Sequence, residues 1–175
     1  YGITAKTNED GSREVNLHED VVYKGIDGTV SADKKQVVTG KDTNITLNMN
    51  GNTIDGGYRD GSSEGNGFNA LGVGRNACLT INGASEDSER GTITGSKSVG
   101  NGGAIFVDLY SKLTLNDVNL TNNYASGYGG AISSYGLYAP NNEITLTNVD
   151  LIGNHADGIG GAIYARNSDK VTLTN

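Results

Sequence analysis

The chain has 175 residues, of which 35% are hydrophobic and 19% charged, with 27 glycines, one proline, two phenylalanines and no tryptophan. Because so few large side chains cannot fill the core of a conventional globule, burial has to come from many small, regular layers. The formal net charge of −7 disfavours binding to nucleic acids and to anionic membranes.

Disorder and membrane insertion also fit the sequence poorly. Ile, Leu and Val recur at fixed offsets, which argues against a disordered chain. No apolar run approaches the roughly 18 residues of a spanning helix, and the single Cys78 excludes a disulfide within the chain. A start at Tyr1 and a stop at Asn175 directly after a strand-like run lead us to expect a segment of a longer exported protein.

We treat residues 1–175 as one predicted domain. Its first part, residues 1–36, is the least regular. Val15-Asn16-Leu17 and Val21-Val22-Tyr23 nevertheless have the composition of short strands, so an initial coil or cap is expected there. Regular coils are expected over residues 37–175.

A triplet with threonine between two apolar residues gives the period of these coils. It occurs as Ile45-Thr46-Leu47, Leu79-Thr80-Ile81, Leu113-Thr114-Leu115, Ile144-Thr145-Leu146 and Val171-Thr172-Leu173. The triplets begin 34, 34, 31 and 27 residues apart, which indicates stacked repeats. Side chains alternate between the faces of a strand, so the threonines are expected to form an outward ladder.

Two further strands follow each triplet. In the coil that begins at Leu113, they are predicted at Val118 to Leu120 and at Ile132, directly after a Gly-Gly-Ala sequence. The equivalent residues are Ile54, Ile93 and Leu151 for the second strand, and Leu71, Ile105 and Ile163 for the third. The high glycine content excludes a helical solenoid. The pattern predicts an all-β fold, a parallel β-helix with three strands per coil and about 27–34 residues per coil.

Paired motifs in the last two full coils carry a family resemblance. Leu120-Thr121-Asn122-Asn123 and Leu151-Ile152-Gly153-Asn154 each precede a Gly-Gly-Ala-Ile sequence within ten residues. The pair resembles the Phe-x-x-Asn and Gly-Gly-Ala-Ile/Leu/Val repeats of chlamydial polymorphic membrane proteins, with Leu where that family has Phe. Similar repeats occur in other bacterial autotransporter passengers and surface adhesins. The resemblance implies a right-handed parallel β-helix at the bacterial cell surface, anchored through a segment outside this chain or secreted, that acts in adhesion.

A second resemblance keeps an enzymatic alternative open. The run from Ile45 to Gly56 resembles the opening coil of pectin-lyase-like proteins, a superfamily of enzymes and binders. Asp55, Arg59 and Asp60 are the best candidates for a polysaccharide lyase or glycoside hydrolase site, which would need converging carboxylates and bases.

The acids of the regular coils do not align, however. The counterparts expected one coil away are Gly95 for Asp55, Asn148 for Asp117 and Asn119 for Asp150. Neither His18 nor His155, which takes the place of Tyr124 one coil on, has metal-ligand spacing. We therefore predict no catalytic residue, no cofactor and no metal site.

The loops that follow the third strands carry the predicted binding residues. Stacking should bring Tyr110, Tyr135 and Tyr138 to one edge, where tyrosine offers flat, amphipathic contact area. The predicted partners are a host surface protein or a glycan, or a second copy in self-association. Three tyrosines in one groove would favour a glycan, and a long flat polar face would favour self-association.

The threonine ladder leaves a third functional alternative. Regular threonine arrays occur on ice-binding β-solenoids. The second outward rank, however, reads Asn48, Asn82 and Asn116, and threonine is an ordinary residue on the exposed side of a strand.

Overall fold

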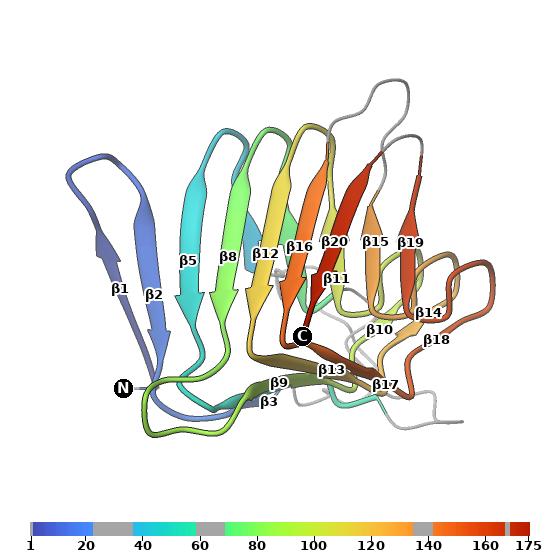
Figure 1. Ribbon diagram of the computed structural model, residues 1–175, viewed down its shortest axis with the longest axis horizontal. Coiled ribbons are helices and arrows are strands. Elements are labelled where there is room, and N and C mark those ends of the chain that lie inside the picture. The colour runs from blue at the N-terminus through green and yellow to red at the C-terminus, as the bar shows by residue number, and fades with distance from the viewer. Residues whose placement is uncertain (1, 23–36, 59–68, 135–141, 167–168) are drawn as a thin grey trace, which may run out of the picture.

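The computed structural model describes residues 2–22, 37–58, 69–134, 142–166 and 169–175 and confirms a parallel β-helix (Figure 1). Every regular element in these ranges is a strand. No helix in the described part of the chain is long and apolar enough to cross a membrane.

The threonine triplets form the first sheet, which has seven strands. In spatial order they are β1 (Ile3–Thr7), β2 (Arg13–Leu17), β5 (Asn44–Asn48), β8 (Cys78–Asn82), β12 (Lys112–Asn116), β16 (Glu143–Thr147) and β20 (Lys170–Thr174). The five predicted threonines pair directly from coil to coil, Thr46 with Thr80 at one end and Thr145 with Thr172 at the other. The predicted ladder is therefore confirmed.

The second and third predicted strands form two sheets of five strands each. The second sheet contains β3 (Val21–Val22), β6 (Thr53–Asp55), β9 (Gly91–Thr94), β13 (Val118–Thr121) and β17 (Asp150–Ile152). The third sheet contains β4 (Val37–Thr39), β7 (Leu71–Val73), β11 (Ile105–Val107), β15 (Ile132–Ser134) and β19 (Ile163–Ala165).

A short sheet lies between the second and third sheets of three coils and adds a two-residue strand to the three predicted ones. Its strands are β10 (Lys97–Ser98), β14 (Tyr124–Ala125) and β18 (His155–Ala156). Two residues are too few to produce an alternating pattern, so the sequence gives no periodic signal for these strands.

The register of the second sheet corrects one expected pairing. Asp55 lies opposite Thr94 rather than Gly95, because Ile54 pairs with Ile93. The loop before β9 is longer than the loop before β6, so positions counted through the two loops do not correspond. Asn119 lies opposite Asp150 as predicted.

The N-terminal strand β1 runs antiparallel to β2 and closes one edge of the first sheet. The two strands are joined by a tight turn in which Asn8 donates its backbone N–H to the carbonyl of Ser12 at 2.8 Å. The strands expected near Val15 and Val21 are present as β2 and β3 and begin the parallel stack.

The core is a column of inward side chains from the strands of every coil. On β12, Leu113 and Leu115 have no exposed surface, whereas Lys112 is exposed and Thr114 and Asn116 are half-buried. Burial of a leucine side chain contributes roughly 1.5–3 kcal/mol, and the same pattern recurs from coil to coil. Many modest layers thus replace the large aromatic core that this chain lacks.

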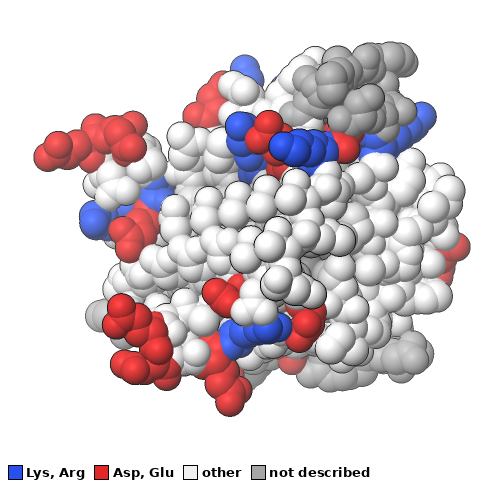
Figure 2. All heavy atoms as spheres, in the orientation of Figure 1, with Lys and Arg blue, Asp and Glu red and all other residues white. Residues whose placement is uncertain are grey.

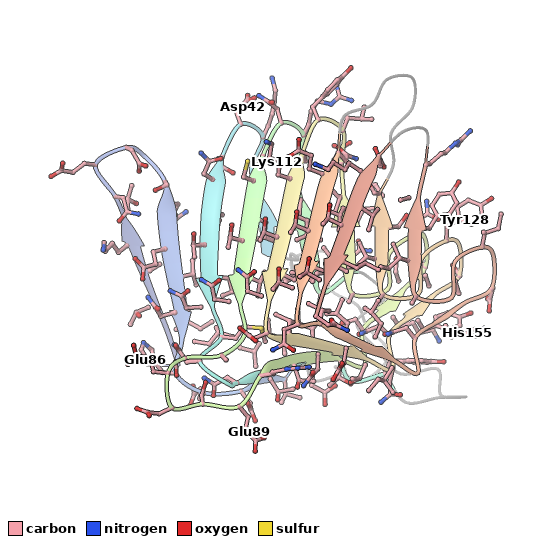
Figure 3. The ribbon with its side chains drawn as sticks, viewed as in Figure 1. Asp42, Glu86, Glu89, Lys112, Tyr128 and His155 are labelled. Carbon is pink, nitrogen blue, oxygen red and sulfur yellow. The ribbon has the colours of Figure 1, made fainter. Side chains whose placement is uncertain are left out.

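Charged side chains lie around the first sheet rather than on its middle. Figure 2 shows an uncharged band across this face, with Lys, Arg, Asp and Glu above and below it and at the N-terminal end. Figure 3 places Asp42 and Lys112 at one edge of the sheet and Glu86 and Glu89 beyond the other.

Buried asparagines satisfy the backbone at the corner where the second sheet leads to the short sheet. The Asn123 side chain accepts a hydrogen bond from the backbone N–H of Ser96 at 3.1 Å and donates to the carbonyl of Ile93 at 3.1 Å. One coil on, Asn154 donates to the carbonyl of Leu120 at 2.8 Å and accepts from the Asn123 amide at 3.0 Å. These side chains continue the ladder of hydrogen bonds where strand pairing stops.

The first two Gly-Gly-Ala-Ile sequences place their second glycine against the backbone of the next coil. A Cβ atom on Gly130 would lie 2.0 Å from the carbonyl oxygen of Gly161, and one on Gly103 would lie 2.0 Å from that of Gly130. The first glycine, such as Gly129 with φ +69°, has a left-handed conformation that side chains disfavour. The repeated motif is therefore required by close packing of coils.

Substitution of this second glycine should disrupt the stack. We expect Gly130→Ala to lower the free energy of unfolding by about 3 kcal/mol, because the new methyl group would overlap backbone that cannot move independently. Gly100→Ala is the matched control, since the nearest atom to its Cβ would be the Ser98 hydroxyl at 3.9 Å. Denaturant unfolding followed by circular dichroism measures both, and equal stability of the two variants would contradict the packing role.

Candidate functional site

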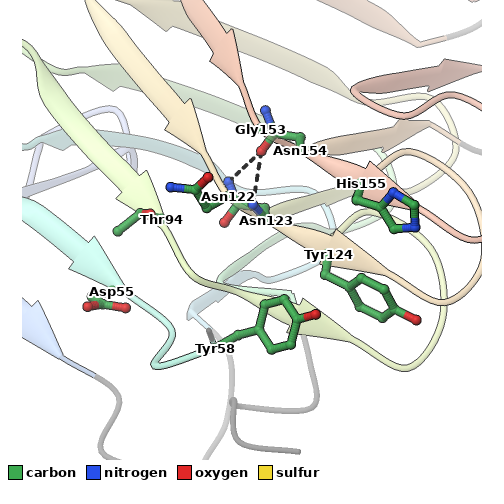
Figure 4. Close-up of a pocket in the computed structure, with 9 residues that line it drawn as sticks. All are labelled: Asp55, Tyr58, Thr94, Asn122, Asn123, Tyr124, Gly153, Asn154 and His155. Carbon is green, nitrogen blue, oxygen red and sulfur yellow. Dashed lines mark hydrogen bonds between the residues drawn. The ribbon is translucent and has the colours of Figure 1, made fainter. Parts of the chain in front are cut away.

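A solvent-open groove runs along the corner between the second sheet and the short sheet (Figure 4). Its volume is about 830 Å3. Residues from four successive coils line it, because the same corner position recurs on each coil. They are Asp55, Tyr58, Thr94, Asn122, Asn123, Tyr124, Gly153, Asn154 and His155.

Turn geometry places polar groups on the wall of the groove. Asn122 and Gly153 occupy equivalent turn positions and have φ values of +53° and +64°, a region that asparagine and glycine tolerate better than other residues. A Cβ on Gly153 would lie 2.4 Å from the side-chain oxygen of Asn122. The missing side chain at Gly153 thus leaves room for the Asn122 amide.

Three rings lie along the groove, and the coil between those of Tyr58 and Tyr124 contributes Lys97 instead of a ring. The Tyr58 and Tyr124 ring centroids are 5.3 Å apart with a tilt of 42°, and those of Tyr124 and His155 are 5.7 Å apart at 19°. Tyr124 and His155 are direct partners in the short sheet, where parallel strands lie about 4.8 Å apart. The Lys97 ammonium lies 4.9 Å from the centroid of Tyr58, within the range of a cation–π contact.

Asp157 joins two of the rings electrostatically. The phenol of Tyr124 donates a hydrogen bond to one carboxylate oxygen of Asp157, and His155 Nε2 lies 3.3 Å from the other. The hydrogen bond to Asp157, together with burial, raises the pKa of Tyr124 to about 12. The same hydrogen bond fixes the orientation of this phenol.

The wall of the groove combines aromatic rings with amides, a hydroxyl and a carboxylate. Asn122 and Asn154 supply amides, Thr94 a hydroxyl and Asp55 a carboxylate. The Asp55 carboxylate accepts a hydrogen bond from the Gly57 backbone N–H at 2.8 Å. Groups of this kind are suited to hold a ligand that has many hydroxyls and some apolar surface.

Of the tyrosines predicted to bind, only Tyr110 lies in the described part of the chain, and it is not among the residues that line this groove. Tyr110 has 53% of its surface exposed and lies in the turn between β11 and β12, whereas Tyr135 and Tyr138 lie outside the described residues. Of the enzymatic candidates, Asp55 lines the groove, and Arg59 and Asp60 lie outside the described residues.

The sequence did contain one signal for the groove. His155 and Tyr124 are recognisable as equivalent positions, and the structure stacks them. Tyr58 could not be assigned to this column because more residues separate β6 from β7 than separate the corresponding strands of the later coils. His18 lies elsewhere and contacts the Thr4 hydroxyl at 2.9 Å. Among the described residues, no cluster of three or more His, Cys, Asp or Glu side chains could hold a metal ion.

Comparison with known proteins identifies two copies of a bacterial repeat. Residues 117–135 and 148–166 match the model of the Chlamydia polymorphic membrane protein repeat, which confirms the resemblance carried by the paired motifs. Each match runs from the second to the third sheet and so contains the groove corner and the glycine turn, with Tyr124 in one copy and His155 in the other. Searches of curated proteins and of solved structures found no match.

Titration of Tyr124 tests the geometry of the ring column. We expect one phenol, that of Tyr124, to ionise near pH 12, and its pKa to return toward the ordinary value of 10 in Asp157→Asn. Tyrosinate absorbance measures both titrations. Because the raised pKa favours the neutral phenol, its stabilising contribution is present below pH 10 and is lost as the pH rises through 12.

Tyr124→Phe identifies the phenol responsible, since it should remove the high-pH step altogether. Circular dichroism at each pH shows whether the chain is still folded. A wild-type chain without a step above the ordinary tyrosine range would contradict the Tyr124–Asp157 hydrogen bond.

Proposed function

We propose that the chain is a non-catalytic, adhesive segment of a bacterial surface protein and that it holds part of a neutral glycan in the polar groove. The observation that carries the proposal is the column formed by Tyr58, Tyr124 and His155 beside the amides of Asn122 and Asn154. Surface location and adhesion are supported by the polymorphic membrane protein repeats, which include this corner of two coils.

The chemistry of the wall suits a saccharide. Sugar hydroxyls donate and accept hydrogen bonds, and the side-chain amide of Asn122 can do both, while Asn154, whose oxygen accepts from Asn123, can offer an N–H. Ring edges and the outer face of His155, whose side chain is 65% exposed, can contact the C–H faces of a pyranose. A rigid sheet holds these groups in place, so little ordering of the protein opposes binding.

Charge favours a neutral glycan over an acidic one. Asp55 lines one end of the groove and Asp157 lies at the other through its contacts with Tyr124 and His155. The net charge of −7 adds a long-range repulsion for anions. Lys97 lies over the tyrosine rings and partly offsets this field.

A non-catalytic role is favoured because glycoside hydrolysis ordinarily requires two carboxyl groups on either side of the scissile bond. Among the described residues that line the groove, Asp55 is the only one with a carboxylate. The Asp157 carboxylate is already engaged by a phenol and an imidazole.

A glycan array probed with the 175-residue chain tests this proposal directly. We expect saturable binding to neutral glycans that falls by about fivefold in His155→Ala, since one ring contact is worth roughly 1 kcal/mol. Tyr110→Ala is the control, because it removes an exposed ring in a turn away from the groove.

Reducing ends and ultraviolet absorbance are measured on the same samples. New reducing ends or unsaturated products would overturn the non-catalytic role. Absence of glycan binding, or loss of binding in Tyr110→Ala but not in His155→Ala, would overturn the assignment of the groove.

A further inference from the structure

The outward face of the first sheet carries two straight ranks of uncharged polar side chains. One rank is the threonine ladder from Thr46 to Thr172. The other contains the outward residues two positions further along each strand, Asn16, Asn48, Asn82, Asn116, Thr147 and Thr174. Both ranks cross the uncharged band seen in Figure 2.

Hydrogen bonds between coils hold the asparagines of the second rank in one orientation. The Asn48 amide donates to the side-chain oxygen of Asn16 at 3.0 Å, Asn82 to Asn48 at 2.9 Å, and Asn116 to Asn82 at 3.0 Å. An amide has two N–H groups and two lone pairs on its oxygen, so hydrogen-bonding capacity remains beyond that used along the row. The row is thus a preorganised line of alternating donors and acceptors.

One ion pair lies beside these ranks, and another lies at the N-terminal end of the threonine rank, where Glu14 is opposite Thr46 and accepts a hydrogen bond from Asn48 at 3.2 Å. Lys112 and Glu143 form an ion pair of 3.0 Å on adjacent strands, and Lys170 is the next residue in that edge row. Lys6 and Glu14 form another pair, of 3.5 Å, toward the N-terminal end. Opposite charges in these pairs neutralise each other locally, which leaves the centre of the face without a strong field of either sign.

We propose that this face binds the same face of a second copy of the chain, so that the β-helix associates with itself side to side. Hydroxyls and amides each donate and accept, so a face made of both is chemically complementary to itself. A strongly acidic chain repels its own copies through most of its surface, and this uncharged band is where two copies can approach with least repulsion.

The size of the face indicates weak pairing. Five strands spaced by about 4.8 Å and about five residues of 3.3 Å each give roughly 300–400 Å2 on one copy. A stable interface buries about 800 Å2 per partner. One pair of chains is therefore expected to dissociate readily, whereas many copies close together on one surface would remain associated through multiple contacts.

Sedimentation velocity over a range of chain concentrations, with reductant present to keep Cys78 reduced, measures this association. We expect the wild type to form dimers as the concentration rises, and Thr114→Glu to raise the dissociation constant by about tenfold or more because two glutamates would face each other. The substituted side chain lies two residues from Lys112 on the same face, so it is tolerated within one copy.

Thr92→Glu is the matched control, since it adds the same charge at a half-buried strand position of the second sheet. It should dimerise as the wild type does. A chain that is monomeric at every concentration, or a dimer that Thr114→Glu leaves unchanged, overturns the proposal. Glycan binding by Thr114→Glu is measured in parallel and should be unaffected. The proposal for the groove and the proposal for this face are thereby tested separately.

Discussion

The constraint on which the whole molecule depends is that the backbone of each coil must lie within hydrogen-bonding distance of the next around its full circuit. Strand pairing meets this requirement on the four sheets, but the corners have no strands. Glycine at Gly103 and Gly130 permits the approach, and Asn123 and Asn154 supply hydrogen bonds for corner backbone groups. A buried polar group left unpaired costs about 1–3 kcal/mol, so these corner residues are as necessary as the core leucines.

At a second corner, different residues supply hydrogen bonds to the corner groups. Between the third and first sheets, the Asn142 side chain accepts a hydrogen bond from the Ser111 backbone N–H at 2.8 Å and donates to the Ser134 hydroxyl at 2.8 Å. Asp169 continues this network into the next coil by accepting from Ser134. In-register stacking also explains the groove, because the same constraint that aligns corner asparagines aligns the rings of Tyr124 and His155.

The residues themselves explain how far the sequence could predict this structure. The alternating triplets and the Gly-Gly-Ala-Ile turns have a strong period, so three strands of each coil and the register of the threonine ladder could be derived from it. The strands at Lys97, Tyr124 and His155 have only two residues each, and β1 pairs antiparallel outside the repeat, so neither leaves a periodic signal. The groove could not be derived because it depends on the place of Tyr58 after the end of β6, outside any strand, whereas the tyrosine prediction rests on the expected stacking of the segments that follow the third strands.

The stacking of parallel coils also determines how the molecule responds to force. Strand pairing joins each coil only to the coils before and after it, and the strands lie across the axis of the stack. A force applied between the two ends therefore acts on the hydrogen bonds between one pair of adjacent coils at a time. It does not shear the hydrogen bonds of many coils together. Under tension the chain would lengthen coil by coil, and the coils that had not yet opened would keep their folded surfaces.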